Sequence, residues 1–339
     1  MEHKTYTFSK QATQFYFDAG FNDLQEIVDK SRAIIITDKN IEKIYPEKFT
    51  GWKTITIEPG ENNKQQFTVD RIIEQLVQLE ADRYTTLIGV GGGVVTDITG
   101  YVASVYMRGI KFGFVPTSLL CIVDASIGGK NGIDVGVVKN MVGTISQPSF
   151  ILHDQSFLSQ LPEKEWINGF AEIIKHACIK DPVLFSLLKE NEVASIVHSK
   201  EMLKAMIRNN VEIKISIVMR DEFEEGERKL LNFGHTIGHA VETIHDLPHG
   251  HAISIGMVHA CRLSEKFAGL DPAISAQIIS LLEKYYLPTS ANLEIDKILE
   301  LIRHDKKRIG DRINFILLNN IGDAVVTPLS FDEIKTVWS

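Results

Sequence analysis

Five of the eleven histidines of this 339-residue chain lie in one short stretch, LNFGHTIGHAVETIHDLPHGHA at residues 231–252. His235 and His239 are four residues apart, so in a helix their imidazoles share one face, with Glu242 beside them. The apolar residues of the stretch fall on the opposite face of the helical wheel. These histidines therefore face either water or a cleft. We expect His249 to follow in a loop that folds back over the start of the helix.

A second predicted helix, GFAEIIKHACIK at residues 169–180, carries Glu172, Lys175 and His176 at i, i+3 and i+4 spacing. Taken alone, Glu172 and Lys175 predict a weak, exposed ion pair. One carboxylate together with two imidazoles could instead form a zinc site that keeps one coordination position for substrate.

The residues between the histidines limit the kinds of reaction that such a metal site could catalyse. HTIGH has Thr236 where peptidases with the HEXXH motif carry their catalytic glutamate, so a zinc peptidase is not expected. Gly234 and Gly238 would let another backbone segment come close to the helix. What remains is a metal that polarises a hydroxyl or carbonyl group.

A glycine turn stands in LIGVGGGVVTD, residues 87–97, between a predicted strand and a predicted helix. Free amides at a helix N-terminus favour an anion such as phosphate. The dinucleotide fingerprint G-x-G-x-x-G is not met, because Val94 and Thr96 stand where its last glycine is required. We therefore favour a pyrophosphate-binding turn outside that fingerprint over a turn with no ligand. Next to a metal, it suggests oxidation of an alcohol by NAD.

A second glycine-rich stretch, residues 123–143, contains Lys130, Lys139 and Asn140. Lysines in such a loop can bind a phosphate or a carboxylate as point charges. A solvated surface loop explains the composition equally well.

The predicted secondary structure that positions these residues changes from alternating strands and helices to mainly helices along the chain. Short apolar strands alternate with helices in the first half, which predicts an α/β domain with a parallel sheet. The predicted strands are 33–38, 85–90 and 112–120, and the predicted helices are 67–81 and about 97–106. Amphipathic helices follow at 185–219 and 273–287. We expect an α/β domain at residues 1–155 and a mostly α-helical domain at 156–339.

Composition excludes several classes of protein. A net charge of −8 does not suggest a nucleic-acid binder, and no apolar run approaches the roughly 20 residues that span a bilayer. The three cysteines are far apart and the N-terminus lacks a signal-peptide pattern, which favours a reducing cytoplasm. Binding of anionic small molecules must then depend on local lysines and arginines.

Eight segments, in order from about residue 85 to 320, resemble the 3-dehydroquinate synthase family of the shikimate pathway. They are GGGVVTDITGYVASVYMRGI, VPTSLL, VDASIGGKNGI, KNMVG, LPEKEWINGFAEIIKHACI, RKLLNFGHTIGHAVE, HGHAISIGM and HDKKRIGDRINFILL. The first 80 residues match weakly, although TDKN and EPGENNK occur where the family contacts NAD. The resemblance implies a Rossmann-like NAD-binding domain, a helical metal-binding domain and a homodimer.

The resemblance also assigns residues. The ligands of zinc or cobalt would be Glu172, His235 and His249. The NAD contacts would be Asp38, Asn40, Glu61, Lys64, Gly92, Gly93, Asp97, Thr117, Ser118, Leu120, Lys139, Leu161 and Glu165. The substrate contacts would be Arg108 from the neighbouring subunit, Asp124, Lys130, Asn140, Lys175, Lys214, Arg228, Asn232, His239 and one or both of Lys306 and Lys307. Thr96, Asn131, Asp134, Gln160 and His251 differ from the residues usual in the family.

The implied activity is that of a carbon–oxygen lyase acting on a small anionic sugar phosphate. Transient oxidation by NAD, loss of phosphate, re-reduction and an aldol closure would convert 3-deoxy-D-arabino-heptulosonate 7-phosphate into 3-dehydroquinate. Another sugar-phosphate cyclase is a rival, although cyclases of substrates without a carboxylate should not need Lys214 and Arg228. A metal-dependent polyol dehydrogenase and a non-enzymatic metal-binding module are further alternatives.

Overall fold

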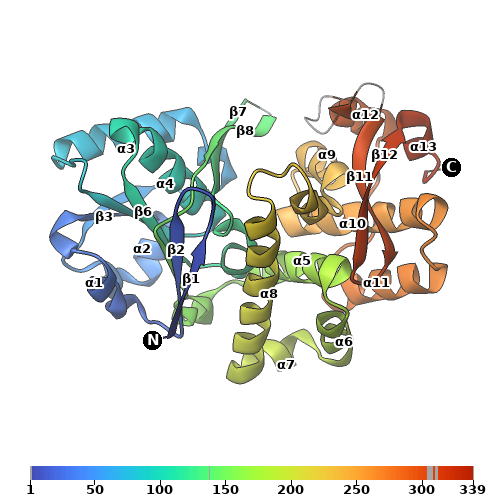
Figure 1. Ribbon diagram of the computed structural model, residues 1–339, viewed down its shortest axis with the longest axis horizontal. Coiled ribbons are helices and arrows are strands. Elements are labelled where there is room, and N and C mark those ends of the chain that lie inside the picture. The colour runs from blue at the N-terminus through green and yellow to red at the C-terminus, as the bar shows by residue number, and fades with distance from the viewer. Residues whose placement is uncertain (1, 137, 304–307, 310–311, 339) are drawn as a thin grey trace. The chain divides into compact units, whose positions relative to one another are not determined.

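The computed structural model in Figure 1 describes residues 2–136, 138–303, 308–309 and 312–338. The chain divides into two compact units, Met1–Glu165 and Trp166–Ser339. The expected division between residues 155 and 156 falls inside the first unit. The α/β first unit and the mostly helical second unit that the sequence predicts are both present.

The first unit is built on a sheet that has seven strands within the described residues (Figure 1). In spatial order they are β1 (Glu2–Thr7), β2 (Ala12–Phe17), β9 (Phe150–Leu152), β6 (Lys111–Pro116), β5 (Thr86–Gly91), β3 (Ala33–Asp38) and β4 (Lys53–Ile57). All neighbours pair in parallel except β1 and β2. Parallel strands with helical connections bury both faces, which explains the uninterrupted apolar run AIIIT of β3.

Two sequence-based boundaries in this unit were wrong. The strand predicted to reach residue 120 ends at Pro116, and a π-helical turn over Cys121–Ala125 follows shortly after it. Proline ends the ladder because it has no N–H to donate. The helix predicted from about residue 97 begins at Gly93, directly after the glycine turn. The predicted β3 and the helix near residues 67–81 are confirmed, the latter over Gln66–Gln78.

The helices of the first unit are α1 (Leu24–Ile27), α2 (Lys39–Ile44), α3 (Gln66–Gln78) and α4 (Gly93–Val105). A separate antiparallel hairpin is formed by β7 (Lys130–Val135) and β8 (Val138–Ile145). The hairpin packs on α4, where Thr144 Oγ1 donates to Ser104 Oγ at 3.0 Å. Most described residues of the second glycine-rich stretch therefore belong to this hairpin, and its first residues, 123–125, lie in the π-helical turn.

The second unit consists mainly of helices. In chain order they are α5 (Glu163–Lys180, whose first turn belongs to the first unit), α6 (Pro182–Glu190), α7 (Val193–His198), α8 (Lys200–Arg220), α9 (His235–His245), α10 (His249–Phe267), α11 (Pro272–Lys284), α12 (Ile295–Arg303) and α13 (Phe331–Lys335). No helix in the described ranges is both long enough and apolar enough to cross a bilayer.

A small antiparallel sheet in the second unit was not expected from the sequence. Its strands are β10 (Arg308–Ile309), β11 (Arg312–Asn320) and β12 (Asp323–Ser330). Ile313, Phe315 and Leu317 on β11 are buried in one core cluster with residues of α9, α10 and α12. The sheet thus completes the hydrophobic core on which the histidine-bearing helices rest.

The close packing of α9 and α10 depends on glycine. Gly234, the residue before α9, adopts a left-handed backbone with φ of 78°, and the helix begins at His235. A Cβ atom at Gly256 of α10 would lie only 1.9 Å from the Gly234 carbonyl oxygen, and one at Gly238 would lie 3.1 Å from the Ala252 carbonyl oxygen. The expected close approach of another backbone at Gly234 and Gly238 is therefore confirmed.

Candidate metal centre and cofactor site

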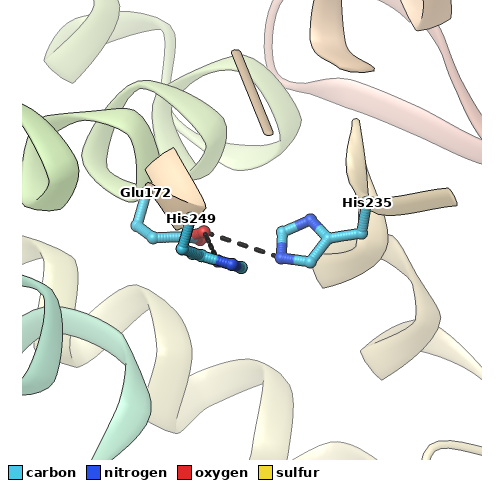
Figure 2. A group of neighbouring side chains, drawn as sticks. All are labelled: Glu172, His235 and His249. Carbon is cyan, nitrogen blue, oxygen red and sulfur yellow. Dashed lines mark hydrogen bonds and ion pairs between the residues drawn. The ribbon is translucent and has the colours of Figure 1, made fainter. Parts of the chain in front are cut away.

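Three side chains from three helices of the second unit converge, as Figure 2 shows. Glu172 Oε1, from the middle of α5, lies 3.1 Å from His249 Nε2 and 3.5 Å from His235 Nε2. His235 and His249 are the first residues of α9 and α10. His249 thus belongs to a helix and not to the loop that the sequence suggested. The three donor atoms all lie within 4.8 Å of one another.

This donor set fits a divalent metal ion. Tetrahedral zinc with bonds of about 2.1 Å places its ligand atoms roughly 3.4 Å apart, which is close to the separations found here. The second nitrogen of each imidazole also meets an oxygen: His235 Nδ1 lies 3.1 Å from the Phe233 carbonyl, and His249 Nδ1 lies 3.6 Å from Glu242 Oε2. Such outer contacts orient metal-binding imidazoles and fix the tautomer that presents Nε2.

Burial controls the charges in this cluster. Glu172 and Lys175 are completely buried and form a close ion pair, so their interpretation as a weak exposed pair was wrong. Burial lowers the pKa of His235 to about 3, which keeps its imidazole neutral. Burial also acts to lower the pKa of His249, but Glu172 and Glu242 outweigh it and raise that pKa to about 10. The cluster therefore favours a positive charge at His249, a charge that a metal cation could supply.

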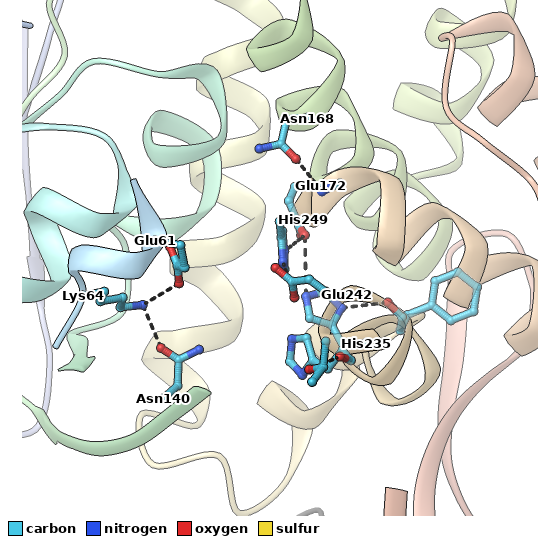
Figure 3. A network of polar contacts seen from close by, with 12 residues as sticks. Glu61, Lys64, Asn140, Asn168, Glu172, His235, Glu242 and His249 are labelled. Carbon is cyan, nitrogen blue, oxygen red and sulfur yellow. Dashed lines mark hydrogen bonds and ion pairs between the residues drawn. The ribbon is translucent and has the colours of Figure 1, made fainter. Parts of the chain in front are cut away.

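Asn168 fixes the start of α10 relative to α5. Its side-chain oxygen accepts a hydrogen bond from the Gly250 amide (Figure 3). A Cβ atom at Gly250 would lie 2.5 Å from the Asn168 carbonyl oxygen, so only glycine allows this approach. Sequence reasoning did not identify Asn168, because an asparagine inside a predicted helix gives no signal of the residue it contacts.

His239 lies next to the three converging side chains without being one of them. Its ring centroid is 5.2 Å from that of His235 and 6.1 Å from that of His249. His239, Glu242 and His249 form a second group with donor atoms within 4.8 Å of one another. The predicted position of His239 beside the metal ligands agrees with this arrangement.

The cationic residues predicted for the second unit lie on α8 and on the turn before α9. Lys214 and Arg228 are both buried, at 6% and 2% exposure. Buried cations of this kind suit an anionic ligand, since they are little screened by water. Lys306 and Lys307 lie outside the described residues.

The turn around Arg228 is held by acidic residues. Asp221 accepts hydrogen bonds from the amides of Glu225, Gly226 and Arg228. Asn232 contacts the carboxylate of Glu224, which has a left-handed backbone with φ of 63°. Sequence reasoning did not select Asp221 or Glu224, although the acidic run before Arg228 was a usable signal.

In the first unit, the residues predicted for NAD include a charge cluster around the buried Lys64 (Figure 3). Lys64 Nζ lies 2.6 Å from Asp97 Oδ2, 3.7 Å from Glu61 Oε1 and 2.8 Å from Asn140 Oδ1. Burial acts to lower the pKa of Lys64, but Asp97 and Glu61 outweigh it and hold the pKa above its ordinary value. The structure thus brings together residues from three separate parts of the sequence, near positions 61–64, 97 and 140.

The glycine turn links β5 to α4. Gly92 precedes the first residue of α4, Gly93, and no side chain among the described residues caps this helix. Thr117 N donates to the Gly91 carbonyl at 3.0 Å, which places Thr117 and Ser118 beside the turn. Thr96 is buried and its hydroxyl donates to the Gly93 carbonyl at 3.0 Å. The amides of this helix start can face an anion.

The remaining predicted residues occupy several elements. Asp38 at the end of β3 caps α2 by accepting from the amides of Asn40 and Ile41. The others are Arg108 after α4, Leu120 and Asp124 around the π-helical turn, Lys130 and Lys139 on the β7–β8 hairpin, Leu161 two residues before α5, and Glu165 in its first turn. Lys175 lies on α5 one turn after Glu172.

Known families match both units in chain order. The family described as 3-dehydroquinate synthase N-terminal matches residues 54–168, and that described as 3-dehydroquinate synthase C-terminal matches residues 169–308. A 3-dehydroquinate synthase of Streptococcus pneumoniae (strain JJA) is 38% identical over 327 residues, 92% of this chain and 91% of the relative. The chain belongs to the 3-dehydroquinate synthase family.

Solved structures of sugar-phosphate cyclases share the fold of this 3-dehydroquinate synthase family member. A 2-deoxy-scyllo-inosose synthase complexed with carbaglucose-6-phosphate, NAD+ and Co2+ has a TM-score of 0.88 at 25% identity, with 99% of each chain covered. ValA, a 2-epi-5-epi-valiolone synthase from Streptomyces hygroscopicus subsp. jinggangensis 5008 with NAD+ and Zn2+ bound, has a TM-score of 0.88 at 26% identity, covering 100% of this chain and 97% of that one.

Proposed function

We propose that this protein converts 3-deoxy-D-arabino-heptulosonate 7-phosphate into 3-dehydroquinate and phosphate, with NAD and zinc or cobalt as cofactors. The convergence of Glu172, His235 and His249 in a member of the 3-dehydroquinate synthase family supports it most directly. Net loss of phosphate from a carbon–oxygen bond makes the reaction that of a lyase, and NAD is regenerated in each cycle.

The three converging side chains would hold the metal. A divalent ion bound there would lower the pKa of a substrate hydroxyl, and bound NAD would supply the hydride chemistry. Glu242 and the Phe233 carbonyl keep Nε2 of each imidazole directed at the ion. Lys175, held by Glu172, would donate a hydrogen bond to a substrate hydroxyl, and His239 would contact the substrate beside them.

The first unit would bind NAD. The amides at the start of α4 suit the pyrophosphate, and Ser118 lies beside the same turn, since a Cβ atom at Gly92 would lie 3.6 Å from Ser118 Oγ. Asp38 and Asn40 would lie near the adenosine. The cofactors named with the cyclase structures, NAD+ with Co2+ or Zn2+, support this assignment.

The substrate carries a phosphate and a carboxylate, so its recognition needs several cations. Lys214 and Arg228 are buried cations of the second unit, and Lys130 on β7 is a cation of the first. Their role would be to hold both anionic ends while the ring is oxidised, loses phosphate and closes again. Holding one substrate through successive steps is a large part of such catalysis.

We also propose that the protein is a homodimer in which Arg108 reaches the neighbouring active site. Arg108 is exposed and follows directly on the exposed Met107 at the end of α4. Met141, Val142 and Ile145 on the adjoining β8 are also exposed. An apolar surface of this kind is typical of an interface between subunits. The three cysteines are buried and form no disulfide, which supports an expected location in the cytoplasm.

Phosphate release tests the proposed function. Purified protein with NAD, zinc and the heptulosonate phosphate should release one phosphate per substrate, with no net accumulation of NADH. The matched control is the variant His235→Ala, which should release none. Absence of phosphate release from protein with both cofactors bound would exclude the proposed activity.

The same assay separates the rival cyclases and the dehydrogenases. Sedoheptulose 7-phosphate and glucose 6-phosphate lack the carboxylate, so they should be turned over far more slowly if Lys214 and Arg228 recognise it. Faster turnover of either sugar would point to another cyclase. A steady rise in NADH with glycerol would point to a polyol dehydrogenase.

A further inference from the structure

Asp134 lies near the end of β7, at an irregularity of the hairpin. The regular pairing of β7 with β8 is interrupted between Ile133 and Val135. Opposite this point, Asn140 of β8 has a left-handed backbone with φ of 55°. Asparagine adopts this conformation more readily than most residues other than glycine, and a hydrogen bond to its amide can hold it there.

The Asp134 carboxylate supplies that restraint. Its Oδ1 accepts a hydrogen bond from the Asn140 amide at 2.7 Å. Asp134 is only 8% exposed, whereas Asn140 lies at the surface, so this bond is partly buried. An amide that leaves the ladder of a hairpin needs such a substitute acceptor.

Asp134 is also joined to the loop before α3. Its own amide donates to the Lys64 carbonyl at 2.8 Å, and its neighbour in this parallel bridge is Gln65. The Lys64 ammonium in turn donates to Asn140 Oδ1 at 2.8 Å. Asp134, Asn140 and Lys64 therefore form a closed circuit of three hydrogen bonds between two segments.

The circuit connects two functional assignments. Lys64 belongs to the residues assigned to NAD, and Asn140 to those assigned to the substrate. Lys64 and Asn140 bond to each other through their side chains. Asp134 bonds to the backbone of each, through its own amide to the Lys64 carbonyl and through its carboxylate to the Asn140 amide. A change at Asp134 should therefore move Lys64 and Asn140 together.

We propose that Asp134 is a positioning residue that sets Lys64 for NAD and Asn140 for the substrate at the same time. This proposal rests on the proposed function. Asp134 touches neither ligand; it acts by fixing the backbone of the β7–β8 hairpin against the loop that carries Lys64. What this requires is an oxygen that accepts the Asn140 amide, and the negative charge is dispensable.

The test compares Asp134→Ala with Asp134→Asn. Alanine removes the accepting oxygen, whereas asparagine keeps it in the same place. We expect D134A to raise both the dissociation constant for NAD and the KM for the heptulosonate phosphate about 10-fold, the effect of one lost hydrogen bond. We expect kcat to change less than 3-fold, and D134N to restore both constants to within about 2-fold of the parent.

Asp29→Ala is the matched control. Asp29 also accepts a hydrogen bond from a nearby amide, that of Ser31 at 2.9 Å, but none of its described contacts involves a residue assigned to a ligand. D29A should leave both constants unchanged. Loss of thermal stability in D134A with unchanged constants would overturn the proposal, as would equal defects in D134N and D134A.

Two further measurements keep the result decisive. Binding of NAD alone needs neither substrate nor turnover, so a parent that binds NAD but releases no phosphate would disprove the function while the variants still test Asp134. If D134A does not fold, hydrogen exchange of the Asn140 amide in the parent decides. A protected amide supports the proposal, and an amide that exchanges at the free rate overturns it.

Discussion

The two charged clusters of the molecule differ in the source of the positive charge beside their carboxylates. In the first unit, Lys64 supplies a positive charge among Asp97, Glu61 and Asn140, so the cluster contains its own cation. In the second unit, Glu172 and Glu242 surround His249, whose imidazole has no fixed charge. The first cluster sets the fixed charge of Lys64 against Asp97 and Glu61. In the second, Lys175 pairs with Glu172, and the imidazoles beside them gain positive charge only from a proton or a metal.

We therefore expect the first cluster to affect mainly the stability of the fold, and the second to affect mainly metal binding and catalysis. The ion pairs around Lys64 should contribute to folding whether or not a metal is bound, because they need no ligand. A cluster of lone-pair donors should contribute most when a divalent ion is bound. The following changes test that distinction, in order of decreasing effect.

The largest effect is expected at the metal ligands. His235→Ala or Glu172→Gln should lower the rate of phosphate release by about 1000-fold or more, equivalent to roughly 4 kcal/mol. Chelation of the metal should have the same effect on the parent, and added zinc should restore it. The exposed His198 provides the control H198A, whose rate and metal content should equal those of the parent. Full activity in metal-free protein would contradict the assignment.

A smaller effect is expected at the cation of the first unit. Lys64→Met removes the ammonium that lies 2.6 Å from the largely buried Asp97 carboxylate, which should lower the free energy of unfolding by about 3 kcal/mol. Urea unfolding should show this loss equally with and without zinc. The control Lys39→Met removes the exposed pair with Glu58 and should change the free energy by less than about 1 kcal/mol. If the loss of unfolding free energy in K64M depended on zinc, the two clusters would not differ in the way described.

The pH dependence of the first unit sharpens the comparison further. His153 is buried against Phe15 and Phe17, and burial lowers its pKa to about 4. Between pH 6.5 and 4 the unfolded chain gains a proton that the folded chain does not, so stability falls with decreasing pH. The loss should reach about 3 kcal/mol from this group.

Substitution of His153 checks that attribution. The variant His153→Leu should unfold with a smaller loss of free energy between pH 7 and pH 4 than the parent. This difference between parent and variant should be independent of zinc, because none of the predicted metal ligands lies in the first unit. An identical pH profile in parent and variant would show that His153 has no such role.

The smallest effect is expected at Glu242. Glu242→Gln keeps the shape of the side chain but removes the carboxylate that meets His249 Nδ1, so metal affinity should fall 10- to 100-fold. Competition with a chelator measures this directly, without turnover. Glu265→Gln, near the far end of α10, is the matched control and should bind metal as the parent does. Unchanged affinity in E242Q would mean that the carboxylate does not orient His249.

Sequence reasoning identified the elements with strong local patterns. The apolar run 33–38 and the spacing of 67–81 predicted a strand and a helix correctly, because both patterns depend only on neighbours along the chain. The sheet of β10, β11 and β12 was missed. Its strands gain stability by packing on α9, α10 and α12, and such contacts leave no periodic signal of their own.

The histidine spacing and the family resemblance were enough to predict Glu172, His235 and His249 as metal ligands, because residue types and their order in the chain are written in the sequence, and the structure shows that the three side chains converge. Only the tertiary structure decided how those residues meet. Glycines at 234, 250 and 256 allow helices to approach closely enough to align the three donors. Burial then turned an expected surface ion pair at Glu172 and Lys175 into an interior one. Distance and exposure arise from packing between segments far apart in the chain, and no local pattern encodes them.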